Sequence, residues 1–239
     1  MNQLRSSGFT IIEVTLFLAI SGLLLIGVMA AINTNINQQR YMDAVRSFQD
    51  YLQGQYNLVD NVRNNRPDYA CDAVKGMQAG TDVRGTTNCT IIGRFVSLED
   101  NGKTLKSRPI YATKDIVTTS GNNDEDLLSK LGLTLGSPSL SQDDDESTVS
   151  WGANAYIAGN PNNKNLHMVI VRIPNSTVRT YASTDSTANT ISKVIGSSSD
   201  INLCVNPDGM VTTPKQMITI RKDGSNANAI QFVGDSSAC

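Results

Sequence analysis

The amino-acid sequence predicts an α+β protein in which a long N-terminal α-helix, membrane-spanning over its first half, packs on an antiparallel β-sheet head. Residues 9–32 are almost entirely apolar, and an amphipathic helical pattern follows them. All seven prolines lie at Pro67 or beyond, so no proline interrupts a helix before that point. After Pro67, short β-rich runs alternate with Gly, Asn, Ser and Asp. One helix followed by a series of strands indicates α+β rather than alternating βαβ.

The apolar segment 9–32 is long enough to cross a membrane. As a helix, its ~24 residues span ~36 Å, against a hydrocarbon layer of ~30 Å. A polar leader, residues 1–8, precedes it with one base, Arg5, and ends at the small residue Gly8. In a secretory signal peptide the small-residue cleavage site follows the apolar stretch, which is removed with the signal. Here the small residue Gly8 precedes the apolar segment, so cleavage after Gly8 would leave that segment on the mature protein. The segment is therefore expected to be an anchor, with the leader in the cytoplasm and the rest of the chain outside.

A single carboxylate, Glu13, interrupts the apolar segment. An acid at mid-membrane costs roughly 2.5–3.5 kcal/mol, and less near one end. The positive end of the helix macrodipole favours an anion in the first turns, and cleavage after Gly8 would create an amine at Phe9, four residues away. We expect Glu13 to be an assembly residue that pairs with an amine. The alternative is an acid near the interface that has no role.

The motif GFTIIE, with Gly8, Phe9, Thr10 and Glu13, resembles the processing site of type IV prepilins and type II secretion pseudopilins. The resemblance implies the type IV pilin fold, cleavage between Gly8 and Phe9 by a prepilin peptidase, and methylation of the new amine on Phe9. It also implies that Glu13 pairs with the N-terminus of a neighbouring subunit. The implied partners are a major pilin, other minor pilins and an inner-membrane assembly platform. An ordinary signal anchor with a tolerated acid is the alternative.

Residues 33–66 are predicted to continue the helix and to pack on the head. Their apolar residues recur at steps of three and four, an amphipathic period: Tyr41, Val45, Phe48, Leu52, Tyr56 and Val59. Polar residues lie opposite: Gln39, Arg46, Asp50, Gln53 and Asp60. The residue before a proline is disfavoured in a helix. The helix is therefore predicted to end at residue 66, immediately before Pro67.

Residues 67–239 are predicted to form a β-rich, disulfide-bonded globular head. The candidate strands are rich in β-branched and aromatic residues: residues 90–98, 110–118, 149–158, 166–173, 202–205, 216–221 and 229–233. The most apolar of them, 166–173, is expected to lie centrally. Turns are expected at 206–209 and 223–224. The segment 202–233 resembles the end of the GspH/FimT group of minor pseudopilins and minor pilins, which implies a minor subunit.

The four cysteines, Cys71, Cys89, Cys204 and Cys239, all fall in this head. An even number outside the membrane predicts two disulfides, for which three connectivities exist. Proximity in the sequence favours Cys71–Cys89 and Cys204–Cys239. A zinc site is the alternative, but the sequence contains no CxxC motif and one histidine, His167.

Two acidic stretches, 124–126 and 143–146, raise the possibility of bound calcium, the one cofactor considered. Consecutive acids cannot all point at one ion, so solvated loops within an excursion from the sheet, residues 122–147, are the preferred interpretation. His167 lies in an apolar run with no catalytic motif around it, so we expect no enzyme activity. The net charge of −2, with no long basic run, gives no support for direct nucleic-acid binding.

The sequence thus predicts a minor type IV pilin: a single-pass inner-membrane protein with its head outside the cytoplasm, which reaches the cell surface on assembly. Priming or tip assembly is the expected role, in support of adhesion, twitching motility or DNA uptake. A minor pseudopilin of a type II secretion system is the first alternative. A membrane-anchored binding domain that does not polymerise is the second.

Overall fold

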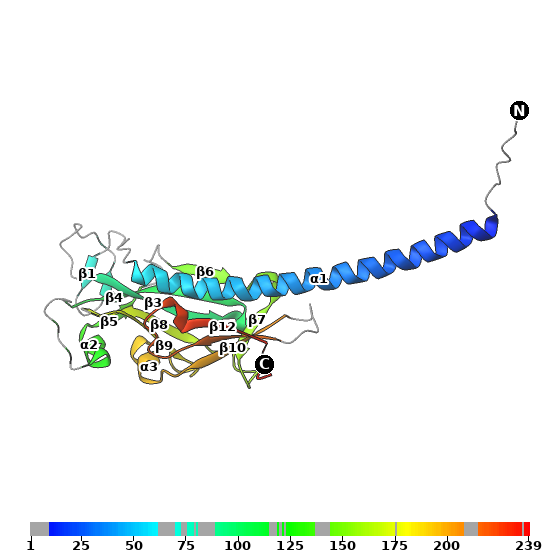
Figure 1. The fold of residues 1–239 in the computed structure, drawn as a ribbon. Helices are drawn as coiled ribbons and strands as arrows, with labels where there is room; N and C mark the ends of the chain where they lie inside the picture. The colour runs from blue at the N-terminus through cyan, green and yellow to red at the C-terminus, as the bar shows by residue number, and fades with distance from the viewer. Residues whose placement is uncertain are drawn as a thin grey trace, which may run out of the picture.

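The computed structural model describes residues 10–61, 70–72, 76–78, 80, 89–114, 119, 121, 123–136, 144–174, 176–207, 215–235 and 237–239. One long helix, α1 (Ile11–Asp60), extends far beyond a β-rich head, as Figure 1 shows. The sheets of the head are antiparallel. The predicted α+β class, a long N-terminal helix followed by an antiparallel β-sheet head, is therefore confirmed.

Helix α1 begins after Thr10 and runs for 50 residues without a break, a length of about 75 Å. No proline lies within it, and Gly22, Gly27 and Gly54 do not interrupt it. The helix ends at Asp60 rather than at residue 66 as predicted. The last turn closes at Asn61, because its backbone N–H and its side-chain amide both donate to the Asn57 carbonyl, at 2.9 and 3.0 Å. Pro67 lies outside the described residues.

Two larger sheets and one small pair make up the described β-structure. The strands of the first sheet have the order β5-β4-β3-β8-β9, with β6 paired to β4: β3 (Thr90–Glu99), β4 (Thr104–Ala112), β5 (Leu133–Leu135), β6 (Asp145–Thr148), β8 (His167–Arg172) and β9 (Val178–Ser183). The second sheet has the order β12-β11-β10-β7: β7 (Asn154–Ile157), β10 (Ile201–Asn206), β11 (Gln216–Ile220) and β12 (Ile230–Asp235). The small pair is β1 (Ala70–Asp72) with β2 (Gly76–Gln78).

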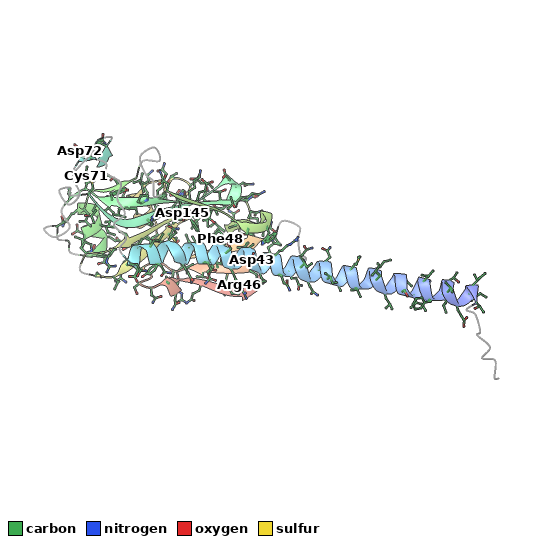
Figure 2. The ribbon with its side chains drawn as sticks, turned by 90° about the horizontal axis from the view of Figure 1, so that it is seen from above. Asp43, Arg46, Phe48, Cys71, Asp72 and Asp145 are labelled. Carbon is green, nitrogen blue, oxygen red and sulfur yellow. A yellow bond between two sulfur atoms is a disulfide. The ribbon has the colours of Figure 1, made fainter. Side chains whose placement is uncertain are left out.

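Two short helices and three 3-10 turns complete the described elements: α2 (Asp124–Lys130), α3 (Ile191–Gly196), η1 (Asp100–Gly102), η2 (Ser150–Gly152) and η3 (Ala227–Ala229). The second half of α1 lies along the head, between the edge strand β6 of the first sheet and the edge strand β12 of the second. Figure 2 shows this half of α1 running between Asp145, on β6, and β12. The helix therefore closes the gap between two sheet edges.

The first sheet separates two hydrophobic cores. The core on the α1 side combines the buried stripe of the helix with residues of both larger sheets, such as Val96, Met168 and Leu203. The core on the other side lies under α2 and α3 and contains Phe95 and Val169. Alternate residues of β3 and β8 therefore face opposite cores, as the period of a strand requires. Strand β8 pairs with β3 and β9, which confirms its predicted central position.

Two predicted strands differ from the structure in their bounds by more than two residues. The segment predicted as 110–118 is part of β4, which already begins at Thr104 and ends at Ala112. Its first half alternates buried Leu105 and Ser107 with the half-exposed Lys106 and Arg108. Because of these charged residues, the first half was not recognised as a strand in the sequence. The segment predicted as 149–158 is shortened to β7, because η2 occupies residues 150–152.

The region 122–147 is not the excursion from the sheet that was predicted. The Asn123 side chain accepts a hydrogen bond from the Asp126 N–H at 2.8 Å and so caps α2. The acids in its first turn suit the positive end of the helix dipole, and Asp124 pairs with Arg179 of β9 at 3.1 Å. Strands β5 and β6 both pair with β4. Most of the described part of this region therefore belongs to the folded head.

The two predicted turns have different outcomes. In the turn at 206–209, Asp208 and Gly209 lie outside the described residues. The turn at Asp223–Gly224 does join β11 to β12, but through a longer connection that includes η3. Gly224 also forms a bridge with Thr180 of β9, where Thr180 N–H donates to the Gly224 carbonyl at 3.2 Å. This turn therefore links the edges of the two larger sheets instead of forming a simple hairpin.

Candidate functional site: the exposed half of the long helix

The N-terminal half of α1 projects away from the described part of the head (Figure 1) and exposes nearly all of its apolar side chains. Large exposed hydrophobic residues run from one end of this half to the other: Ile11, Ile12, Val14, Leu16, Phe17, Leu18, Ile20, Leu23, Leu24, Leu25, Ile26, Val28, Met29, Ile32 and Ile36. So large a contiguous apolar surface marks contact with a membrane or with other protein. Within the described residues, α1 is the one helix long and apolar enough to cross a membrane.

The single acid of this surface, Glu13, has hydrogen-bond partners within its own chain. Its carboxylate accepts from the backbone N–H of Thr10 at 2.9 Å and from the Thr10 hydroxyl at 3.0 Å. The Glu13 N–H donates to the same hydroxyl at 3.3 Å. This reciprocal arrangement is a capping box, which satisfies donors that the first turn of a helix leaves open. Glu13 thus has a helix-capping role, in addition to the predicted assembly role.

The other predicted processing and assembly residues, Gly8 and Phe9, lie outside the described residues. The glycines of the exposed half, Gly22 and Gly27, have open space where a Cβ would stand. In a single copy of the chain these glycines therefore serve no packing purpose. Small residues of this kind allow helices to approach closely, and the space around them is available to a neighbouring helix.

The second half of α1 is fixed to the head along one stripe. All six predicted apolar residues of the stripe are buried: Tyr41, Val45, Phe48, Leu52, Tyr56 and Val59. Ala44 and Gln55 are buried beside them. The Tyr41 hydroxyl donates to the Val205 carbonyl at 2.8 Å and accepts from the Gln216 N–H at 2.6 Å. It thereby joins the helix to the paired ends of β10 and β11.

Replacing Tyr41 by Phe is expected to lower the free energy of unfolding by about 1–3 kcal/mol, the usual cost of depriving buried polar groups of a partner. The Tyr41 ring stays in place, so the Val205 carbonyl and the Gln216 N–H lose a hydrogen bond without leaving a cavity. Urea unfolding of the full chain in detergent measures the change. A loss well below this range would show that other groups satisfy the same two backbone atoms.

A polar network joins α1 to the edge strand β6. The Gln55 amide donates to the Asp145 carboxylate at 2.9 Å, and the Ser107 hydroxyl donates to the Gln55 oxygen at 2.7 Å. The Tyr51 hydroxyl donates to the backbone carbonyl of Asp145 at 3.1 Å. Burial raises the pKa of Tyr51 above its ordinary value, and the Asp145 charge acts in the same direction. Asp145, predicted as part of a solvated acidic loop, therefore holds β6 against the helix.

Two disulfides are present, and they link the pairs that proximity favours. Cys71 is bonded to Cys89 and Cys204 to Cys239, with Cα–Cα distances of 5.8 and 5.5 Å. The second disulfide ties the last residue to β10. The Cys239 carbonyl also accepts from the Tyr156 hydroxyl at 2.7 Å.

Neither acidic stretch forms an ion site in the described part of the head. Among the described residues, no group of three or more His, Cys, Asp and Glu side chains is arranged to hold a metal. In the first stretch, Asp124 pairs with Arg179 and Asp126 with Lys130. In the second stretch, Asp145 belongs to the network with Gln55 and Tyr51, and Asp143 lies outside the described residues.

His167 lies at the start of β8, half-buried, with its ring 6.0 Å from that of Phe95. Its Nδ1 is buried and has no hydrogen-bond partner among the described residues. Burial lowers the pKa of His167 below its ordinary value, and the charges of Glu99 and Asp185 partly oppose this. His167 is thus a residue of the sheet, paired with Ser97 of β3 and Ser183 of β9.

The lowered pKa of His167 predicts that the head loses stability as the pH falls through about 6.5. The unfolded chain then binds a proton that the folded chain does not, so the free energy of unfolding decreases. Thermal unfolding of the full chain between pH 7.5 and 5.5 is expected to show this slope, and the variant His167→Gln is expected to show a flatter one. Equal slopes for the two proteins would contradict the prediction.

Two features of the site were not predicted from the sequence, although one of them had a recognisable sequence signal. The capping role of Glu13 had a signal, because Thr10 stands three residues before Glu13 in the capping-box pattern. The other is Trp151 of η2, whose Nε1 donates to the Asp43 carboxylate of α1 at 2.8 Å. The two residues are 108 positions apart, and no local pattern marks such a contact.

No protein-family model, curated protein or solved structure matches this sequence. The assignment of a function therefore depends on the geometry of the chain itself and on the motif at its N-terminal segment.

Proposed function

We propose that this chain is a minor type IV pilin, a subunit that joins a helical filament through α1 and presents its disulfide-bonded head at the filament surface. One observation carries the proposal: a single 50-residue helix is packed on the head over its second half and bare over its first. A helix that only anchors a head needs to do no more than reach and cross the membrane. A continuous rigid helix with one acid near its end can also pack laterally against parallel copies of itself.

The charge of Glu13 supports the same proposal. In the single chain its carboxylate accepts hydrogen bonds from Thr10, which are partners without charge. Inside a bundle of apolar helices an unneutralised carboxylate is expensive, and pairing with an amine removes much of that cost. Processing after Gly8 would supply the amine at Phe9. In this proposal Glu13 of one subunit pairs with the Phe9 amine of the next.

The disulfides support placement of the head outside the cytoplasm. Disulfides persist in oxidising compartments and are rare in the cytosol. Both bonds lie in the head, on the far side of the proposed membrane segment from the leader. In this proposal the chain is a single-pass inner-membrane protein before assembly, and a prepilin peptidase, sibling pilins and an assembly platform are its partners.

Mass analysis of the N-terminus of the purified protein tests the proposal. A species that begins at Phe9, with a methyl group on its amine, is the expected result. A protein that retains Met1 would overturn the proposal. Deletion of the gene then distinguishes the two filament systems, because loss of surface pili and twitching indicates a pilus, whereas loss of exoprotein release indicates a type II secretion pseudopilin.

A non-polymerising binding protein is the second candidate, and one observation favours it. A cleft of about 650 Å³ lies between α2, β5 and α3. Its lining combines apolar residues, such as Leu128, Leu133 and Ile191, with polar ones, such as Glu125 and Ser192. This volume falls within the range of small-molecule sites. The same N-terminal mass analysis decides between the candidates, because a binding protein of this kind has no need of processing at Phe9.

A further inference from the structure

The turn η2 holds the single tryptophan of the chain in an exposed and strained position. Trp151 has φ 60° and ψ 24°, the left-handed region that bulky residues rarely adopt. The residue is 52% exposed. The Asp43 carboxylate accepts a hydrogen bond from Nε1, and the Arg40 guanidinium lies 5.0 Å from the ring centre. Strained residues persist where their surroundings hold them, frequently at functional positions.

A second exposed apolar patch lies on the opposite flank of α1. It consists of Phe232 and Val233 on β12, the edge strand of the four-stranded sheet. A β-bulge interrupts the strand here, because Phe232 pairs with Ile218 and Gly234 with Met217, which leaves Val233 as the extra residue. The Gln53 amide donates to the Ile230 carbonyl at 2.8 Å, which fixes the start of β12 beside Gln53. The strand ends at Asp235, opposite Gln216, whose N–H donates to Tyr41. Phe232 and Val233 therefore lie at the level of residues 46–48 of the helix.

The described part of the head exposes three large apolar side chains, and these two patches contain all of them: Trp151, Phe232 and Val233. Trp151 contacts the face of α1 that carries Arg40 and Asp43, which is the face next to η2. Arg46 lies seven residues before Gln53, so the two share the face that borders β12. Complementary patches on two different faces produce a head-to-tail contact, which can repeat without closing.

We propose that Trp151 of one copy of this chain packs against Phe232 and Val233 of a second copy. The inference rests on the proposed function, which makes the copies parallel and offset. If Glu13 of one copy pairs with the Phe9 amine of the other, the second copy is raised by four residues, about 6 Å. Its Trp151, at the level of Arg40 and Asp43, then stands opposite residues 44–47 of the first copy, which overlaps the level of Phe232 and Val233 at residues 46–48.

Charge supports the same step. In the raised copy, Asp43 moves to the level of residue 47 of its neighbour, next to the exposed Arg46. Within the described residues Arg46 takes part in no ion pair, so it is available to a neighbour. Three apolar side chains fall short of the ~1,200 Å² of a stable interface. The bare halves of α1 therefore supply most of the area, and the Trp151 contact sets the register.

Cross-linking between two differently tagged full-length copies tests the contact in the native host. One copy carries Trp151→Cys and the other Val233→Cys, and a short bifunctional maleimide joins neighbouring thiols. Because docking raises the local concentration of the two thiols, this pair is expected to cross-link about tenfold more than a control pair. The control combines Trp151→Cys with Ser192→Cys, an exposed position on α3 beneath the other face of the first sheet. The pair Asp43→Cys with Arg46→Cys reads the same contact with the Trp151 side chain still present, although Asp43→Cys removes its hydrogen bond to α1.

The inference is overturned if neither pair gives a higher cross-linking yield than the control pair. It is also overturned if two copies of Trp151→Cys cross-link to each other in equal yield. N-terminal mass analysis of the same samples reports on the proposed function separately. Processed protein without the cross-link refutes the Trp151 contact and leaves the proposed function intact. A cross-link in protein that retains Met1 supports the contact and refutes the proposed function.

Discussion

Replacing Glu13 by Gln is expected to leave the chain folded and inserted in the membrane, but to lower its incorporation into filaments by up to roughly two orders of magnitude. This upper limit follows from the ~2.5–3.5 kcal/mol that an acid costs at mid-membrane, which a charge partner can recover, at ~1.4 kcal/mol for each factor of ten. Glu13 lies in the first turn of α1, near one end of the segment, where the cost is lower. Fractionation of sheared filaments, with tagged protein quantified against the membrane pool, measures the change.

Glutamine is the informative replacement because it separates two roles of Glu13. The capping box with Thr10 needs an acceptor oxygen at this position, and Gln also serves there. The amine of a neighbouring subunit needs a negative charge, which Gln lacks. Glu13→Gln therefore keeps the helix start and removes the ion pair, whereas Glu13→Ala removes both.

Thr10→Val is the matched control for Glu13→Gln. It deletes the hydroxyl that bonds Glu13 and costs the cap about 1 kcal/mol, but keeps the carboxylate. Near-normal incorporation is expected from this variant. If Glu13→Gln incorporates as well as the native chain while Thr10→Val does not, Glu13 is a helix cap and the assembly role is refuted.

The helix could be predicted closely because its signals are local and periodic. Each of the six apolar residues from Tyr41 to Val59 is buried as the 3.6-residue period requires. The helix end was less accurate, because a side-chain bond from Asn61 to Asn57 closes it before the proline signal applies. The sequence also placed β8 at the centre of a sheet, since a strand buried on both faces reads as a continuous apolar run.

The elements that the sequence did not predict depend on contacts between distant segments of the chain. Strand β9 contains the β-formers Val178, Thr180 and Tyr181, but Arg179 and the serine at its end gave it a polar appearance. Helices α2 and α3 are too short for a helical period to stand out, and each is stable because it covers the sheet. At the candidate site, the sequence drew attention to Glu13, whose assembly role stays a prediction, but not to Trp151, whose partners on α1 lie more than a hundred residues away.

Replacing Phe48 by Ala is expected to lower the free energy of unfolding of the head by about 3–5 kcal/mol. Phe48 is 2% exposed and belongs to the core that α1 shares with both larger sheets. Figure 2 shows it on the half of α1 that lies along the head. Because domains of this kind are stable by ~5–15 kcal/mol, the loss is a large fraction of what holds the helix to the head.

Urea unfolding of the full chain in detergent, followed by the fluorescence of Trp151, measures this effect. Trp151 is the single tryptophan and is bonded to Asp43 on α1, so its signal reports when the helix leaves the head. Asp50→Ala, on the exposed face of the same half, is the matched control and is expected to change stability by at most ~0.5 kcal/mol. Leu23→Ala, on the bare half, is expected to leave the transition unchanged, because Leu23 is 71% exposed and contributes to neither core of the head. Similar transitions for Phe48→Ala and Asp50→Ala would show that the polar bonds of Tyr41, Gln53 and Gln55, rather than the apolar stripe, fasten the rod to the head.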